Sequence, residues 1–294
     1  MASLAAEIVM GQRARYERLW GALTKRQHLL ANDAIADIEA RLKRARPGSW
    51  SAAQAAAMLV QLGDATRGLS ASQQRLLSRA LPGIARISQS DLASYLTRLD
   101  KQFTGSVRPL RWDSAEWLES YSRPLLKSRL RIYRKSFARY GADAVAGIES
   151  AIAKTVLLGT PWTEAREQVM GLVRREVGGR QWMVDRIVRN EVATVHSSTT
   201  MAALLEEDED DDPMLKKLVA VFDKVTAMDS RILHGQTRRV RDLFTDVVHG
   251  KMFDAPPNRP NDREIVIGWR KSWGTDAGFD AATRNDSGGA GTIG

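Results

Sequence analysis

The stretch RPLLKSRLRIYRKSFARY, residues 123–140, carries two different stripes of side chains. At about 100° per residue, its apolar side chains fall along one side of a helix and its cationic side chains along an adjacent side. The apolar stripe consists of Leu126, Leu130, Tyr133 and Phe137. The cationic stripe consists of Arg123, Lys127, Arg131, Arg134 and Lys135. We expect a helix that packs through one face, while the basic face either meets phosphates or an acidic protein surface, or is only solvated.

Helical patterns extend on both sides of this stretch. Residues 4–45 predict one long helix, or two helices joined near residues 31–33, stopped by residues 46–49. Four further signals mark expected helix ends: a capping box of Ser70 with Gln73, a similar pair of Asp113 with Glu116, a start at Thr160-Pro161, and a stop at Gly178-Gly179 before a helix near Gln181. The predicted fold class is a mainly α N-terminal region followed by a small α+β C-terminal domain. A helix bundle is one arrangement that the N-terminal region could adopt.

Charge is distributed unevenly along the 294 residues, whose net charge is +9. Residues 1–140 hold 24 Lys and Arg against 11 Asp and Glu, whereas the remainder is mildly acidic. A basic, helical region over residues 1–150 suits a polyanion such as duplex DNA or an acidic protein, although arginine-rich surfaces also occur without such a partner. Neither a membrane span nor a secretory signal is predicted, so no membrane partner is expected.

The run EEDEDDD, residues 206–212, consists of acidic residues only. Like charges repel, so we expect a solvated loop that separates the helical part from the C-terminal part. The alternating ligands and glycine of a calcium loop are missing from the run. The chain has no cysteine and no HxxxH, HExxH or phosphate-loop motif. No metal, cofactor or catalytic residue is predicted.

Short β-like runs lie beyond the acidic segment, at residues 218–225 and 265–269. Turn residues lie between them, and the Gly-rich tail of residues 275–294 is expected to be flexible. Asp229 is expected to close an Asx-type turn after the first strand. His234, His249, Asp229 and Lys251 are either an acid/base set or, as we favour for His234, structural residues that bind a nearby loop.

Four segments occur in an order that resembles the phage Mu F-like head morphogenesis proteins. They are residues 186–193 (RIVRNEVA), 218–225 (LVAVFDKV), 229–235 (DSRILHG) and 253–263 (FDAPPNRPNDR). The resemblance implies a Mu F-like domain over residues 151–274. The motif residues that would fix its fold are Arg189, Glu191, Asp229, Arg231, His234, Gly235, Pro257, Pro260, Asn261 and Arg263.

The chain departs from the family pattern at three points. Asn190 replaces the usual threonine, Gly235 follows His234 directly, and Asp262 and Glu264 occupy positions that are cysteine in the family. Any metal-binding or crosslinking capacity of those cysteines is lost here. We expect the two carboxylates to pair instead with Arg259, Arg263 or Arg270.

The resemblance implies a non-enzymatic minor structural protein of a tailed-phage head or a related prophage particle. Its implied partners are the portal protein, the major capsid protein and packaged double-stranded DNA, and its implied location is the head interior or portal vertex, with assembly in the host cytoplasm. Two alternatives stay open: a nuclease or toxin-like effector that uses His234, His249 and Lys251, and a general DNA-binding protein of the host.

Overall fold

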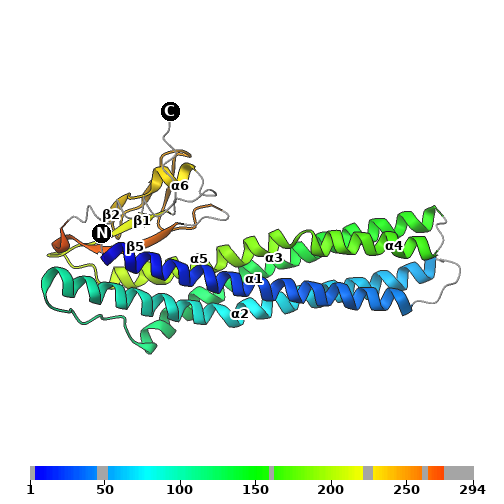
Figure 1. Ribbon diagram of the computed structural model, residues 1–294, viewed down its shortest axis with the longest axis horizontal. Helices are drawn as coiled ribbons and strands as arrows, with labels where there is room; N and C mark the ends of the chain where they lie inside the picture. Colours follow the sequence, from blue (N-terminus) through cyan, green and yellow to red (C-terminus); the bar gives the residue numbers. More distant parts are fainter. Residues whose placement is uncertain (1–3, 45–51, 159–161, 221–227, 260–263, 275–294) are drawn as a thin grey trace. The chain divides into compact units, whose positions relative to one another are not determined.

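A computed structural model describes residues 4–44, 52–158, 162–220, 228–259 and 264–274 (Figure 1). Several predictions concern residues outside these ranges: the stop at residues 46–49, the start at Thr160-Pro161, the strand residues 221–225, the motif positions Pro260, Asn261 and Arg263, and the tail. The predicted fold class is confirmed, because a long helical region precedes a small part with antiparallel strands and short helices.

The first helix ends close to where the sequence patterns indicated, and the next two are longer than indicated. The helices of the long helical region are α1 (Leu4–Arg44), α2 (Ala52–Thr104), α3 (Ala115–Leu157), α4 (Trp162–Val173), the π-helix η1 (Arg174–Gly178) and α5 (Gln181–Glu206). The first helix continues through residues 31–33, so the single-helix alternative is correct. The stop at Gly178-Gly179 is also correct: Gly179 donates its N–H to the carbonyls of Arg174 and Arg175, and α5 begins at Gln181.

One predicted helix start is wrong, and at another the helix begins as expected but a different residue caps it. Ser70 and Gln73 lie in the middle of α2, where both are buried and no helix begins. The capping pattern had no effect because the helix already runs through the residues before it, which satisfies the N–H groups that a cap would bind. At the start of α3, Ser114 takes the role expected of Asp113, and its Oγ accepts the N–H of Trp117 at 3.1 Å.

The chain forms two compact units, each assembled from separate stretches of sequence. The helical unit contains residues 21–80 and 128–188, and the mixed unit contains residues 1–20, 81–127 and 189–294. The domain boundary expected at residue 150 lies inside α3.

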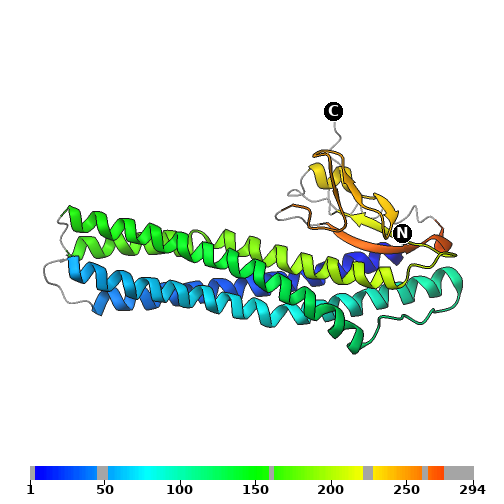
Figure 2. The ribbon, with the colours of Figure 1, turned by 180° about the vertical axis from the view of Figure 1, so that it is seen from behind.

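In the helical unit, segments of α1, α2, α3 and α4 run side by side (Figures 1 and 2). Their apolar stripes meet in one core made of Ala31, Ile38, Leu42, Met58, Leu62, Leu69, Ala144, Ile148, Ile152, Val169, Met170, Val173 and Val177. Tyr140 ties α3 to η1, because its hydroxyl donates to the carbonyl of Val177 at 2.9 Å.

The mixed unit combines helix segments with a three-stranded antiparallel sheet of order β2-β1-β5. The strands are β1 (Met214–Val219), β2 (Thr237–Arg239) and β5 (Ile265–Arg270), and the short helices α6 (Met228–Leu233) and η2 (Lys271–Trp273) flank them. Strands β3 (Phe244–Asp246) and β4 (Lys251–Phe253) form a separate hairpin. The strand expected at 265–269 is confirmed, whereas the first strand begins earlier than expected, at Met214.

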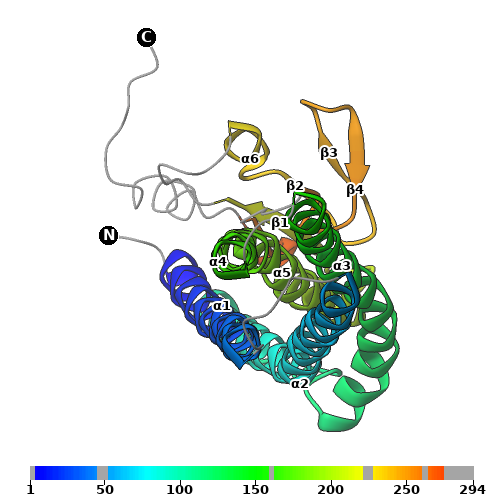
Figure 3. The same ribbon diagram turned by 90° about the vertical axis from the view of Figure 1, so that its right-hand side faces the viewer.

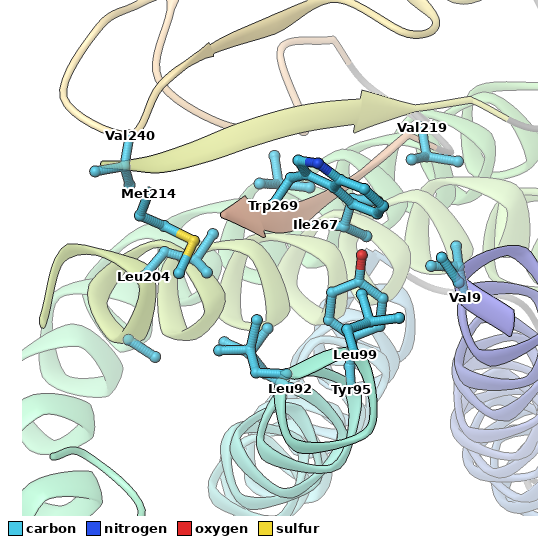
Figure 4. Packing of buried hydrophobic residues seen from close by; sticks show 14 of the residues in the cluster. Val9, Leu92, Tyr95, Leu99, Leu204, Met214, Val219, Val240, Ile267 and Trp269 are labelled. Atoms are coloured by element: carbon cyan, nitrogen blue, oxygen red, sulfur yellow. The ribbon is translucent and has the colours of Figure 1, made fainter. Parts of the chain in front are cut away.

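Helix segments pack against this sheet in a shared core (Figure 4). Val9 of α1 and Leu92, Tyr95 and Leu99 of α2 belong to the same buried cluster as Ile267 of β5. The core therefore joins residues from both ends of the described chain.

Gly268 allows the close approach of β5 to α5. A Cβ at this position would lie only 2.3 Å from Cδ2 of Leu204.

Candidate functional site

The cationic stripe predicted on residues 123–135 lies on α3, and all five of its side chains are exposed. Tyr133 and Phe137 of the adjacent apolar stripe are buried, while Leu126 and Leu130 are half-buried. The Tyr133 hydroxyl also contacts Ser78 Oγ of α2 at 2.7 Å. These contacts fix how this part of α3 is rotated in the helical unit.

The five cations differ in their surroundings. Arg123 pairs with Glu119 one turn earlier, in a contact between two exposed side chains that contributes little. Within the described ranges, Lys127, Arg131, Arg134 and Lys135 form no ion pair. Arg123 and Lys127 belong to the mixed unit, and the other three belong to the helical unit.

Asp229 does not close an Asx-type turn, because it lies in the first turn of α6 and binds a side chain instead. The Arg259 guanidinium donates to the Asp229 carboxylate, to Ser230 Oγ at 2.8 Å and to Glu264 Oε1 at 3.3 Å. Arg259 thus joins α6 to the segment before β5. The predicted pairing of Glu264 with an arginine is confirmed.

His234 is buried, and its Nδ1 accepts the main-chain N–H of Ala220 at 3.1 Å. An accepting Nδ1 carries no proton, and this nitrogen holds the main chain at the end of β1. Gly235 follows at φ 79°, a backbone conformation that favours glycine, and donates its N–H to the carbonyl of Leu218 at 2.8 Å. This pair has the structural role that we favoured for His234.

His249 lies in the turn of the β3–β4 hairpin, between two carboxylates. Its Nδ1 lies 2.9 Å from Asp246 Oδ2, and its Nε2 lies 3.8 Å from Asp229 Oδ2. Asp246 also accepts the N–H groups of Val248 and His249. Burial acts to raise the pKa of Asp246, but these hydrogen bonds hold it below its usual range. Both ring nitrogens of His249 therefore face groups that shape the turn and link it to α6.

The remaining motif residues are dispersed. The Arg189 guanidinium stacks over the Trp20 ring at 4.1 Å, Glu191 is buried in α5, and Arg231 is exposed on α6. Pro257 is half-buried. These residues lie in different parts of the mixed unit and do not share a centre.

From residue 207 on, the acidic run at residues 206–212 lies in the connection between α5 and β1, as predicted, but the prediction that it is merely solvated is wrong. Each of four of its carboxylates binds an arginine: Glu207 with Arg270 at 2.6 Å, Asp208 with Arg241 at 2.8 Å, Glu209 with Arg111 at 2.8 Å and Asp212 with Arg108 at 2.7 Å. Burial acts to raise the pKa of Asp212, but hydrogen bonds from Ser272 and Arg108 lower it. The run stays ordered because arginines distant in sequence offset its self-repulsion.

A buried polar cluster in the mixed unit was not predicted from the sequence. Tyr16 donates its hydroxyl to Ser88 Oγ at 3.0 Å, and His196 Nδ1 lies 3.1 Å from the same oxygen. The Tyr16 and His196 rings lie 4.0 Å apart, and burial lowers the pKa of His196 to about 4. No single-residue signal marked this cluster, because its members come from three separate helices.

A groove of about 650 Å³ lies between α1 and α2 in the same unit. Its lining includes the cations Arg15, Arg18 and Arg98 but also the acids Glu7 and Asp91. Arg15 binds Asp91, so the charges partly neutralise one another. Because cations and acids both line the groove, its charge does not indicate which class of ligand would bind there.

Within the described ranges, no three His, Asp or Glu side chains are grouped so that they could hold a metal ion. Among the described helices, none is long and apolar enough to cross a membrane. No protein-family model, curated protein or solved structure matches this chain. The resemblance to the Mu F-like family therefore stays a prediction.

Proposed function

We propose that the protein is a non-catalytic structural component of a tailed-phage head or related particle, and that α3 contacts packaged duplex DNA there. The observation that carries this proposal is the set of exposed, unpaired cations on α3. Arg131, Arg134 and Lys135 stand on the helical unit with no carboxylate partner among the described residues. Association with the portal or inner capsid follows from the family resemblance and is part of the same proposal.

The geometry of these cations favours contact with phosphates over reading of bases. Residues 131 and 135 lie about 6 Å apart along the helix axis at 1.5 Å per residue, so their charges line one short edge. Arginine and lysine on such an edge neutralise the DNA backbone, which supplies affinity without sequence preference. A packed helix with Tyr133 and Phe137 buried beneath it holds that edge in place.

The contacts of the histidines favour a structural role over the nuclease alternative. The Nδ1 of His234 holds the Ala220 main chain, and the two ring nitrogens of His249 face Asp246 and Asp229. Nucleophile activation requires a base whose nitrogen faces a reacting group. We therefore assign both residues to the fold of the C-terminal part.

The test compares two charge-reversed variants in a duplex DNA-binding assay across a salt series. Arg131→Glu with Lys135→Glu changes the α3 face, while Lys25→Glu with Arg26→Glu makes the same change in net charge on an exposed part of α1. We expect the α3 variant to lose affinity equally for unrelated sequences, with the slope of log K against log salt reduced by about 2. The α1 variant should bind like the unmodified protein.

Equal effects of the two variants would show that only net charge matters and would overturn the assignment to α3. Binding to the cognate portal protein is measured in parallel. If the α3 variant loses portal binding while the unmodified protein ignores DNA, the face is a protein-docking surface and the DNA contact is wrong.

A further inference from the structure

A second exposed surface lies on the C-terminal part of the mixed unit, away from the cations of α3 in the sequence. Four aliphatic or methionine side chains there are more than half exposed: Met228 at 58%, Ile232 at 52%, Val247 at 62% and Met252 at 64%. Met228 and Ile232 are one helical turn apart on α6, and Val247 and Met252 belong to the β3–β4 hairpin. Hairpin turns are normally polar, so an apolar turn exposed to water is unusual.

Two contacts hold α6 and the hairpin together. His249 in the hairpin turn faces Asp229 of α6 at 3.8 Å. The Gln236 side chain, just after α6, both donates to the Thr245 carbonyl at 3.0 Å and accepts its N–H at 2.7 Å. Figure 3 shows both elements on the same side of strands β1 and β2. The exposed apolar side chains therefore belong to two elements that are held together by direct contacts.

The charge around this surface is weakly cationic, because three of its acids are each paired with a cation. Asp229 is held by Arg259, Asp246 by His249, and Asp254 by Lys216, whose Nζ lies 2.5 Å from Asp254 Oδ1. Lys251 and Arg239 are exposed and form no ion pair within the described ranges. Asp242, in the segment between β2 and β3, is exposed and forms no ion pair within the described ranges.

We propose that α6 and the β3–β4 hairpin form a docking surface for a partner protein that offers the apolar face of an amphipathic helix flanked by carboxylates. The exposed cations favour flanking carboxylates, and the methionines suit an apolar helix face because their flexible side chains adapt to it. The exposed set contains no Trp, Tyr or Phe, the residues enriched where proteins enter a membrane interface, which favours a protein partner over a lipid surface. This surface is independent of the proposed DNA contact.

The test measures binding of the full chain to two synthetic amphipathic helical peptides by fluorescence anisotropy. Both peptides carry leucine on one face, and the other face carries glutamate in one peptide and lysine in its twin. We expect the Leu/Glu peptide to bind at least about 10-fold more tightly than the Leu/Lys twin. Val247→Asp with Met252→Asp should weaken that binding by about 10-fold or more.

The matched control is Leu29→Asp with Val60→Asp, which places the same charges at exposed apolar positions of the helical unit. It should leave peptide binding unchanged. Circular dichroism checks that each variant folds, and Lys251→Glu, which keeps the apolar surface, provides a second variant that should also weaken binding.

Three results would overturn the proposal. The first is equal binding of the two peptides, or binding of neither. The second is binding to vesicles containing one third anionic phospholipid that is lost in the Val247 and Met252 variant, which would identify a lipid surface. The third is concentration-dependent dimerisation, in sedimentation experiments, that the same variant abolishes, which would identify a second copy of the chain as the occupant.

Discussion

Arg270 of β5 and Asp100 of α2 face each other inside the mixed unit, with Arg270 Nε 3.5 Å from Asp100 Oδ1 and both side chains buried. Arg270 also binds Glu207 at 2.6 Å, and Asp100 accepts the indole N–H of Trp273 at 3.0 Å. This cluster connects α2, the acidic segment, β5 and η2. It therefore holds the sheet to α2 through charged groups that are shielded from water.

Replacing Arg270 with methionine should destabilise the protein strongly. The substitution leaves the buried carboxylates of Asp100 and Glu207 without their cation, and breaking a buried pair in this way costs about 3–5 kcal/mol. Urea unfolding followed by circular dichroism measures the loss. Arg123→Met, which removes the exposed partner of Glu119, should cost less than about 1 kcal/mol. Similar losses for the two variants would contradict the importance of the buried cluster.

Gly268→Ala should weaken the contact between β5 and α5. The added Cβ would meet Cδ2 of Leu204, which is itself buried and has little room to move, so we expect a loss of about 1–3 kcal/mol. Thermal unfolding reports the change. Gly83→Ala in α2 meets no atom within 4 Å and should instead be neutral or stabilise by about 0.5–1 kcal/mol. Adding Leu204→Ala to Gly268→Ala should remove part of the strain.

His196 should make stability depend on pH. Its folded pKa of about 4 lies below the unfolded value near 6.5, so below pH 6.5 the unfolded chain binds a proton that the folded chain does not. His196 does not lower the free energy of unfolding above about pH 6.5. As the pH falls from 6.5 toward 4, the free energy of unfolding declines by about 3 kcal/mol in all. In the His196→Phe variant, the free energy of unfolding measured with denaturant should fall less steeply with pH across this range. An unchanged slope would mean that other groups govern the response.

Arg259→Ala should loosen α6. The substitution removes the donor shared by Asp229, Ser230 and Glu264, and it leaves Glu264 buried with one bond fewer. Leaving a buried acceptor unsatisfied costs about 1–3 kcal/mol. In the variant, amide hydrogen exchange should become faster in α6, while the exchange rates in the helical unit should change less. Arg239→Ala, at an exposed position with no ion pair among the described residues, is the control and should leave exchange in α6 unaltered.

The sequence was most informative where a local rule decides the outcome. Helical periodicity predicted the exposed cations and the buried Tyr133 and Phe137 of α3, and two adjacent glycines predicted the break before α5. The run at residues 265–269 predicted β5 because it is rich in β-branched and aromatic residues.

Local rules failed where distant residues decide. Ser70 carries a capping signal, but the helix that precedes it makes a cap unnecessary. The acidic segment is ordered by arginines at positions 108, 111, 241 and 270, and no window of sequence displays that pairing. The buried cluster around Ser88 likewise joins three helices. The assembly of each unit from separate stretches could not be predicted for the same reason.

The shared core of Val9, Leu99 and Ile267 also sets an order of events during synthesis. Residues near the start of the chain leave the ribosome long before the strand that completes their core. Their apolar side chains therefore stay unburied until almost the whole protein has been made. The helical unit, whose last residue is 188, is complete earlier. Contacts between distant parts of a chain form slowly, so the mixed unit should fold last. A nascent chain stalled before residue 265 should expose the apolar surface of this unfinished core, which is the kind of surface that chaperones recognise.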